Sequence, residues 1–231
     1  MAVDAVLFDW GGTLTPWHTI DPAAEWRSVA AVVAPGEVDR ATAALMAAAE
    51  MVWARSRDAH LSSTLEEVCR LAEIDYSERS FDGYRSFWEA STYTSPDAEP
   101  LFEALHAEGI KVGVLSNTLW PRPWHEEFFV RDGLAHLVDG AVYTSEIEWT
   151  KPAPEAFRAA MTSVAVTDPT RCVFVGDRLF DDIYGAHEVG MRAVYVPHSS
   201  IPASQVGHFE GEPDAVIDRL SDLLPVIAAW R

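Results

Sequence analysis

Short apolar segments recur along the chain, each bounded by glycine, aspartate or asparagine. Four of them are apolar on both faces, as buried strands are, and they lie at residues 5–8, 111–115, 172–175 and 193–196. A shorter segment at residues 215–217 also reads as a strand. Stretches with helical periodicity lie at residues 100–108, 154–164, 182–189 and 218–230. This alternation predicts an α/β fold whose parallel sheet is covered by helices on both faces.

The alternation is interrupted between about residues 22 and 91. This region has no strand-like segment but four helical patterns, at residues 23–33, 37–57, 64–74 and 78–90. Ser95, Pro96 and Asp97 close it with residues typical of a turn. We therefore expect an α/β core from residues 1–16 and 95–231, with an all-helical domain from residues 17–94 inserted after the first strand.

The charge of the chain excludes two classes of partner. Its 231 residues include 36 acidic and 17 basic side chains, which give a formal net charge of −19 at pH 7. Such a chain repels the phosphates of nucleic acids and anionic lipid surfaces, so we expect neither as a partner. An anionic substrate would need a bound metal ion or a well-placed lysine to overcome this charge.

The cysteines and the N-terminal residues indicate the cellular compartment of the protein. Cys69 and Cys172 are the only cysteines and lack metal-ligand spacing, which fits a reducing compartment without a disulfide framework. The first residues, MAVDAVLFDWGG, have neither a basic segment nor a long apolar one, so they do not read as a signal peptide. No stretch approaches the roughly 18 apolar residues of a membrane span. We expect a cytoplasmic protein.

Small polar and acidic residues follow the predicted strands. Asp9 follows the first strand, Ser116 and Asn117 the second, and Asp177 the third, with Asp181 and Asp182 just beyond. Any one of these residues alone would be an ordinary turn or helix cap. Because parallel strands all end at the same edge of a sheet, the set together predicts a site there.

Lysine usage adds a cation to this set. Only Lys111 and Lys151 are lysines, and Lys151 lies in a loop that opens a predicted helix. A compact ammonium suits contact with both a carboxylate and a phosphoryl oxygen, where a guanidinium would be larger.

Four segments taken in order carry a family resemblance: FDWGGTL at residues 8–14, VLSN at 114–117, Lys-Pro at 151–152, and VGDRLFDDIYGA at 175–186. Together they resemble the four motifs of the haloacid dehalogenase-like hydrolase superfamily. A helical insert between the first two motifs is similar to the subgroup in which a helical cap closes over a Rossmann-like core. The resemblance covers nearly the whole chain.

The resemblance implies a Mg²⁺-dependent phosphatase acting on a small phosphorylated substrate. Asp9 would attack phosphorus and form an aspartyl phosphate. The Mg²⁺ ligands would be the Asp9 carboxylate, the Gly11 carbonyl and Asp177, with Asp182 or Asp181 in the outer shell. The residues expected to bind the phosphate are Thr13, Ser116, Asn117 and Lys151.

One position departs from the family pattern. Phosphatases of the family usually carry a second aspartate two residues after the nucleophile, as general acid and then general base, and this chain has Gly11 there. Loss of such a group typically costs 10²- to 10⁴-fold in rate, so we expect weak activity or a need for a good leaving group. The nearest substitute acid along the chain is His18.

Two alternatives remain open, a dehalogenase and a binding or regulatory protein, while phosphonate cleavage is disfavoured. Haloacid dehalogenases replace the Gly-Asp of the last motif, which is intact here, and use a cap arginine, for which the candidates are Arg40, Arg55 and Arg57. Phosphonate cleavage in the family needs a cap lysine, and residues 17–94 contain none. A binding or regulatory protein with little turnover would explain Gly11 but not the intact Asp9, Lys151 and Asp177.

Overall fold

The computed structural model describes residues 2–18, 20–197 and 210–230. Its centre is a six-stranded sheet with the order β3-β2-β1-β4-β5-β6, in which every neighbouring pair is parallel. The strands are β1 (Ala5–Phe8), β2 (Lys111–Ser116), β3 (Gly140–Tyr143), β4 (Cys172–Gly176), β5 (Arg192–Tyr195) and β6 (Ala215–Val216). The predicted α/β fold with a parallel sheet is confirmed.

Alternate residues of β1 pack against helices on opposite faces of the sheet. Val6 and Phe8 belong to a core that includes side chains of α5 (Ala98–Ala107) and α10 (Leu223–Ala229). Ala5 and Leu7 belong to a second core with α7 (Pro154–Ser163) and α8 (Gly185–Glu188). Both faces of the strand are therefore buried, which explains its unbroken apolar sequence.

The strand register aligns the ends of the three central strands. Phe8, the last residue of β1, pairs with Val114 of β2 and with Val175 of β4. The residues that follow these positions lie side by side at one edge of the sheet. The motifs of the sequence are brought together by this register.

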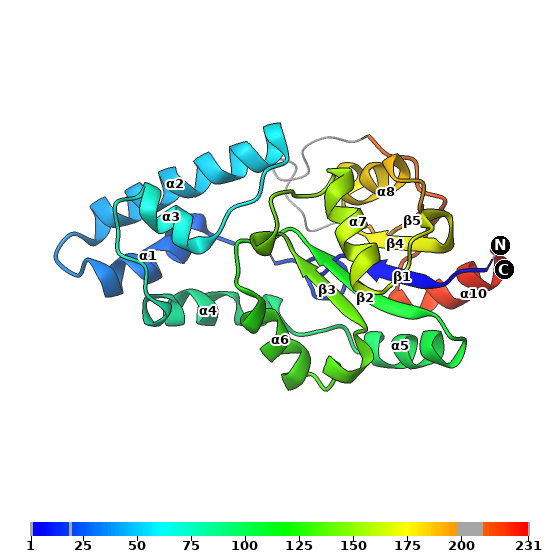
Figure 1. Ribbon diagram of the computed structural model, residues 1–231. Helices are drawn as coiled ribbons and strands as arrows, with labels where there is room; N and C mark the ends of the chain where they lie inside the picture. The colour runs from blue at the N-terminus through cyan, green and yellow to red at the C-terminus, as the bar shows by residue number, and fades with distance from the viewer. Residues whose placement is uncertain (1, 19, 198–209, 231) are drawn as a thin grey trace.

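The region between β1 and α5 is helical. Its helices are α1 (Pro22–Val33), α2 (Val38–Ala59), α3 (Leu65–Leu71) and α4 (Asp82–Trp88), with short 3-10 turns η1 (Glu78–Phe81) and η2 (Glu89–Ser91) on either side of α4. Figure 1 shows them to one side of the sheet. The backbone N–H of Ser95 donates to the carbonyl of Leu14 at 2.7 Å, so the chain leaves the sheet and returns to it at neighbouring points. We propose residues 17–94 as the cap on this basis.

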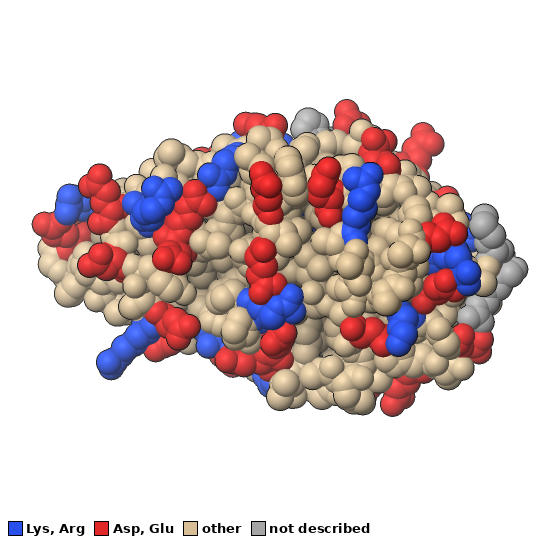
Figure 2. All heavy atoms as spheres, viewed as in Figure 1, with Lys and Arg blue, Asp and Glu red and all other residues tan. Residues whose placement is uncertain are grey.

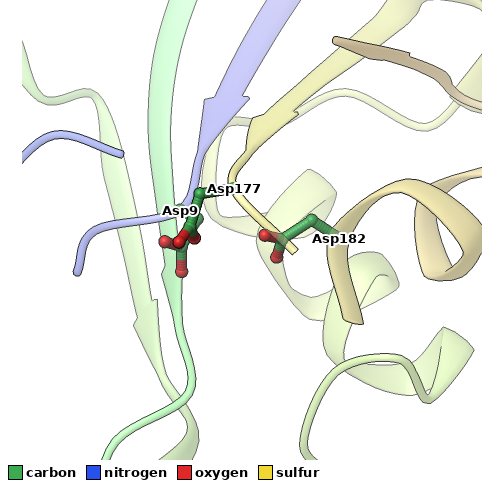
Figure 3. A group of neighbouring side chains, drawn as sticks. All are labelled: Asp9, Asp177 and Asp182. Carbon is green, nitrogen blue, oxygen red and sulfur yellow. The ribbon is translucent and has the colours of Figure 1, made fainter. Parts of the chain in front are cut away.

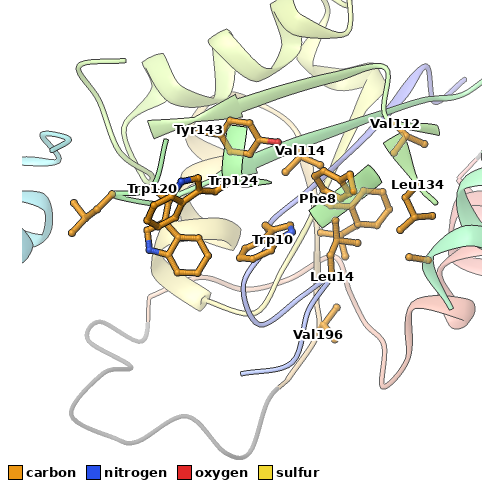
Figure 4. Packing of buried hydrophobic residues seen from close by; sticks show 14 of the residues in the cluster. Phe8, Trp10, Leu14, Val112, Val114, Trp120, Trp124, Leu134, Tyr143 and Val196 are labelled. Carbon is orange, nitrogen blue, oxygen red and sulfur yellow. The ribbon is translucent and has the colours of Figure 1, made fainter. Parts of the chain in front are cut away.

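Aromatic side chains join the sheet to this helical region. The larger core extends from Phe8 through Trp10 to Trp120 and Trp124 (Figure 4). The indole N–H of Trp120 donates to the hydroxyl of Tyr84 in α4 at 3.2 Å. Apolar packing and a hydrogen bond therefore hold the helices against the sheet.

The sequence pattern missed β3 and α6 (Arg122–Arg131) and misjudged two further helices. β3 is only four residues long and begins with glycine and alanine, which rarely form strands, while α6 mixes charged and aromatic residues without a clear apolar stripe. The helix expected at 182–189 is a π-helical turn, η6 (Leu179–Tyr184), followed by the short α8. The last helix begins later than expected, after the 3-10 turn η7 (Leu220–Asp222).

Acidic side chains are spread along the face shown in Figure 2, with basic side chains among them. Within the described residues, no helix has both the length and the apolar character that a bilayer crossing requires.

Gly140 of β3 provides a test of the packing. A Cβ at this position would clash with the backbone carbonyl of Ser163 at the end of α7, which cannot move aside as a flexible side chain would. We expect Gly140→Ala to lower the free energy of unfolding by about 1–3 kcal/mol in urea denaturation. Gly36→Ala, at a loop position with open space around it, is the matched control and should lose no stability. Equal stability of the two variants would contradict this packing.

Candidate active site

Asp9 follows the central strand β1 at the edge where the strands end. Its backbone N–H donates to the carbonyl of Val175 in β4 at 2.9 Å, which extends the strand pairing by one residue. The residue is only 5% exposed. The sheet thus presents a nearly buried carboxylate at the edge where ligands bind in parallel folds.

Three more charged side chains meet Asp9 there. Asp177 follows β4, Asp182 lies in η6, and Lys151 comes from the loop before α7; all three are buried. Lys151 Nζ donates to Asp9 Oδ1 at 2.6 Å and to Asp182 Oδ1 at 2.7 Å. Figure 3 shows Asp177 beside Asp9, with Asp182 extending from η6. One ammonium is therefore shared by two carboxylates.

The side chain of Asn117 holds the backbone of Lys151. Its Oδ1 accepts from the Lys151 N–H at 2.8 Å, and its Nδ2 donates to the Lys151 carbonyl at 3.0 Å. Both the oxygen and the nitrogen of the amide are thus engaged in holding the backbone of Lys151. The sequence had suggested only phosphate binding, because no local pattern links residues 34 positions apart.

Burial and charge together shift the pKa values of this cluster. Burial alone would lower the pKa of Lys151, but the carboxylates of Asp182 and Asp9 outweigh it and raise the pKa above its usual range. Burial raises the pKa of Asp182 to about 7, against the opposing effect of Lys151. Burial, and next the charges of Asp9 and Asp182, raises the pKa of Asp177 well above its ordinary value. Three buried carboxylates share one buried ammonium, and the guanidinium of Arg178 lies at the margin of the cluster with its Nε 3.6 Å from Asp177 Oδ2, so the cluster still has more negative than positive charge.

The unpartnered oxygens of this cluster fit a hard divalent cation. Asp9 Oδ2 and both carboxylate oxygens of Asp177 are buried without a hydrogen-bond partner. One ligand oxygen from each of Asp9, Asp177 and Asp182 lies within 4.8 Å of the others. Buried carboxylate oxygens without donors are costly, and Mg²⁺ prefers such ligands.

Asp182 differs from the other two carboxylates. Its Oδ1 accepts from Lys151, and its Oδ2 accepts from the backbone N–H of Arg178 at 2.9 Å. Both oxygens are occupied, which suits an outer position relative to a cation. The cluster contains Asp182 and not Asp181, the two residues that the sequence left as alternatives.

The turn after Asp9 carries two more predicted residues. The Thr13 hydroxyl is buried without a hydrogen-bond partner, and the Gly12 N–H closes the turn on the Thr15 carbonyl at 2.9 Å. Gly12 has φ +100°, and a Cβ there would lie 2.5 Å from Asp177 Oδ2, so only glycine fits. Gly11 lies in the same turn. Ser116 ends β2 and is buried at this edge of the sheet.

A segment of the helical region also contacts the loop that carries Lys151. The sequence did not indicate this contact. Thr150, the residue before Lys151, donates its N–H to the carbonyl of His60 at 2.9 Å. The Ser62 N–H donates to the carbonyl of Glu148 at 2.9 Å. These two hydrogen bonds flank an antiparallel bridge between Leu61 and Trp149. We call residues 60–62 the bridging segment. It is paired with the loop that carries the buried ammonium.

The profile of the haloacid dehalogenase-like hydrolases matches residues 3–190, a stretch that contains all four motifs and all four clustered residues. The chain belongs to this family. The resemblance inferred from the motifs is thus confirmed, and the chain is a hydrolase.

Named relatives of this haloacid dehalogenase-like hydrolase include phosphatases. Glyceraldehyde 3-phosphate phosphatase of Methanopyrus kandleri is 28% identical over 229 residues, which cover 97% of each chain. Phosphoglycolate phosphatase of Salmonella paratyphi A is 25% identical over 184 residues, which cover 77% of this chain and 71% of that protein.

Solved structures of both phosphatases and dehalogenases share the fold. A HAD phosphatase from Thermococcus onnurineus has a TM-score of 0.67 at 23% identity, with 97% of this chain and 98% of that chain covered. A 2-haloacid dehalogenase from Pseudomonas syringae has a TM-score of 0.66 at 23% identity, with 99% and 100% covered. At this identity the likeness concerns the fold and does not separate the two activities.

The cap arginines considered for a dehalogenase are engaged in ion pairs. Each pairs with a carboxylate of the helical region: Arg40 with Glu37, Arg55 with Glu67, and Arg57 with Glu50 and Asp58. His18, the substitute acid suggested by its nearness to Gly11 along the chain, is exposed.

The raised pKa values make stability of the cation-free enzyme depend on pH. Between about pH 4, where aspartates of an unfolded chain titrate, and about pH 7, the pKa of Asp182, the folded state retains protons that the unfolded state has lost, and the raised pKa of Asp177 acts in the same direction. Raising the pH removes them from the folded state, so their contribution to stability is complete below pH 4 and is lost towards pH 7. Each such proton gives a slope of about 1.4 kcal/mol per pH unit.

We expect Asp177→Asn to reduce this fall in stability between pH 4.5 and 7, measured by urea unfolding in EDTA. Comparison of the two profiles cancels the titration of surface carboxylates. If the free energies of unfolding of wild type and variant fall in parallel with pH, the raised pKa of Asp177 is contradicted.

Proposed function

We propose that this hydrolase is a Mg²⁺-dependent phosphatase that acts on a small phosphorylated metabolite through an aspartyl phosphate on Asp9. The observation that carries the proposal is the pair of Asp177 oxygens beside Asp9, which accept no hydrogen bond and have only the more distant Arg178 Nε, 3.6 Å from Oδ2, as a counter-charge. A metal-independent dehalogenase has no need of a buried carboxylate with no donor at this position. A purely structural protein would gain from replacing it.

The first step uses the two oxygens of Asp9 differently. Lys151 holds Oδ1 and favours the ionised form of the carboxyl group, while Oδ2 has no hydrogen-bond partner. In the proposed step Oδ2 attacks phosphorus as the bond to the leaving-group oxygen breaks. Mg²⁺, held by Asp9, Asp177 and the Gly11 carbonyl, would neutralise charge on the transferring phosphoryl group.

The phosphoryl oxygens would meet donors from three segments. Ser116 at the end of β2 and Thr13 in the turn after Asp9 offer hydroxyl groups, and the Thr13 hydroxyl has no partner within the described residues. Lys151 offers the ammonium, kept in place by Asn117. Donors fixed before the reaction stabilise charge as it develops, and this stabilisation usually contributes more to such catalysis than any other effect.

Relatives support a small substrate. The two phosphatases named above are called after glyceraldehyde 3-phosphate and phosphoglycolate, both short phosphate esters. The two cysteines are free and buried, which supports a reducing cytoplasm as the location.

Replacement of the nucleophile tests the proposal directly. We expect Asp9→Asn to reduce phosphate release from p-nitrophenyl phosphate to the buffer blank, and EDTA to do the same to wild type until Mg²⁺ is restored. Asp39→Asn, which alters an exposed carboxylate of α2 paired with Arg27, is the control and should keep wild-type activity.

The alternatives predict other results. Release of chloride from 2-chloropropionate without Mg²⁺ would make the protein a dehalogenase. Phosphate release by Asp9→Asn at the wild-type rate would remove Asp9 from the mechanism.

A further inference from the structure

His60 ends α2 in a left-handed conformation beside the Lys151 loop. Its φ is 55°, and its N–H donates to the Ser56 carbonyl at 3.0 Å. Its carbonyl accepts from Thr150, and Ser56 Oγ donates to Thr150 Oγ1 at 3.1 Å. The backbone of His60 is therefore fixed from both sides, and its partner Thr150 directly precedes the residue that carries the ammonium.

The imidazole faces the turn that carries Asp182. Its ring centroid lies 6.2 Å from that of Phe180, in η6. Burial raises the pKa of Asp181, the next residue, while the charges of Lys151, Arg178 and His60 lower it. The ring of His60 thus lies near η6, while the backbone of the same residue is hydrogen-bonded to the Lys151 loop.

The backbone role of His60 leaves its ring unexplained. Nδ1 is buried and has no hydrogen-bond partner. Glycine would end the helix in the same left-handed conformation without adding a polar side-chain atom that needs a partner. A partner that arrives with the substrate accounts for the unpaired nitrogen.

We propose that His60 is the general acid and base of this enzyme and supplies the proton transfer that Gly11 cannot. The inference rests on the proposed phosphatase activity. Asp9 attacks phosphorus from the sheet side, so an in-line leaving group lies on the opposite side, towards the cap from which His60 comes. Histidine is the side chain suited to donate and accept a proton near neutral pH.

The proton and electron pairs balance over two steps. As the phosphorus–oxygen bond breaks, its electron pair goes to the leaving-group oxygen, which takes the proton from Nδ1 of the imidazolium while Asp9 Oδ2 bonds to phosphorus. The neutral Nδ1 then accepts a proton from the water that attacks phosphorus, and the electron pair of the Asp9–phosphorus bond returns to the carboxylate. Alcohol and inorganic phosphate leave, and the imidazolium is restored.

His60→Asn tests the proposal, because asparagine tolerates the left-handed conformation and cannot act as the acid. We expect kcat/KM for glycerol phosphate to fall about 10²- to 10⁴-fold, and kcat/KM for p-nitrophenyl phosphate to change less than about threefold, since nitrophenolate leaves without a proton. Activity on the second ester also reports that the variant is folded. His18→Asn is the control and should match wild type on both esters.

A rescue experiment separates proton transfer from positioning. A Cβ at Gly11 would meet only Trp17 Cζ3, at 3.9 Å, and the φ of Gly11 is not positive, so an aspartate fits there. In the His60→Asn background, Gly11→Asp should restore activity on glycerol phosphate at least about tenfold, because it returns a carboxyl group to the usual acid position.

The outcomes distinguish the two proposals. If His60→Asn lowers kcat/KM by the same factor for both esters, or leaves both values unchanged, the role of His60 is overturned and the phosphatase proposal stays intact. No Asp9-dependent phosphate release by wild type from either ester would overturn the phosphatase proposal itself.

Discussion

A single buried ammonium faces three buried carboxylates, and the rest of the site is arranged around this imbalance. Lys151 satisfies one oxygen each of Asp9 and Asp182, and leaves Asp177 without a hydrogen-bond donor, its ion pair being a looser one with Arg178 Nε at 3.6 Å. A buried charge needs a partner in a medium where water cannot screen it. The clamp from Asn117 and the backbone N–H of Arg178 both serve to hold this arrangement.

In the proposed function, the same imbalance distinguishes this protein from a metal-free hydrolase of the same fold. Solved structures of phosphatases and dehalogenases match the chain equally well, so the backbone does not choose between the activities. We propose that the choice lies in one side chain, because Asp177 places a second desolvated carboxylate beside Asp9, the proposed nucleophile. Function in this fold is decided at the strand ends, while the sheet beneath them stays constant.

The sequence predicted the parts of the molecule that depend on local pattern. The central strands, the helical region and the clustering of Asp9, Lys151, Asp177 and Asp182 follow from apolar runs and from the rule that parallel strands end at one edge. It missed β3, whose few residues have little strand preference, and the contact of the bridging segment with the Lys151 loop. That contact joins distant parts of the chain through backbone groups, which leave no trace in side-chain pattern.

The hydrogen bond between Ser95 and Leu14 has a consequence for how such proteins diversify. Because the two ends of the helical excursion meet, the strand register of the sheet does not depend on its length or composition. Helices between these two ends can change in length or sequence without a change in the strand that carries Asp9, provided that the contacts of Tyr84 with Trp120 and of the bridging segment with the Lys151 loop are kept. At this junction the helical region can therefore acquire a new recognition surface while the strands that carry the site residues stay unchanged.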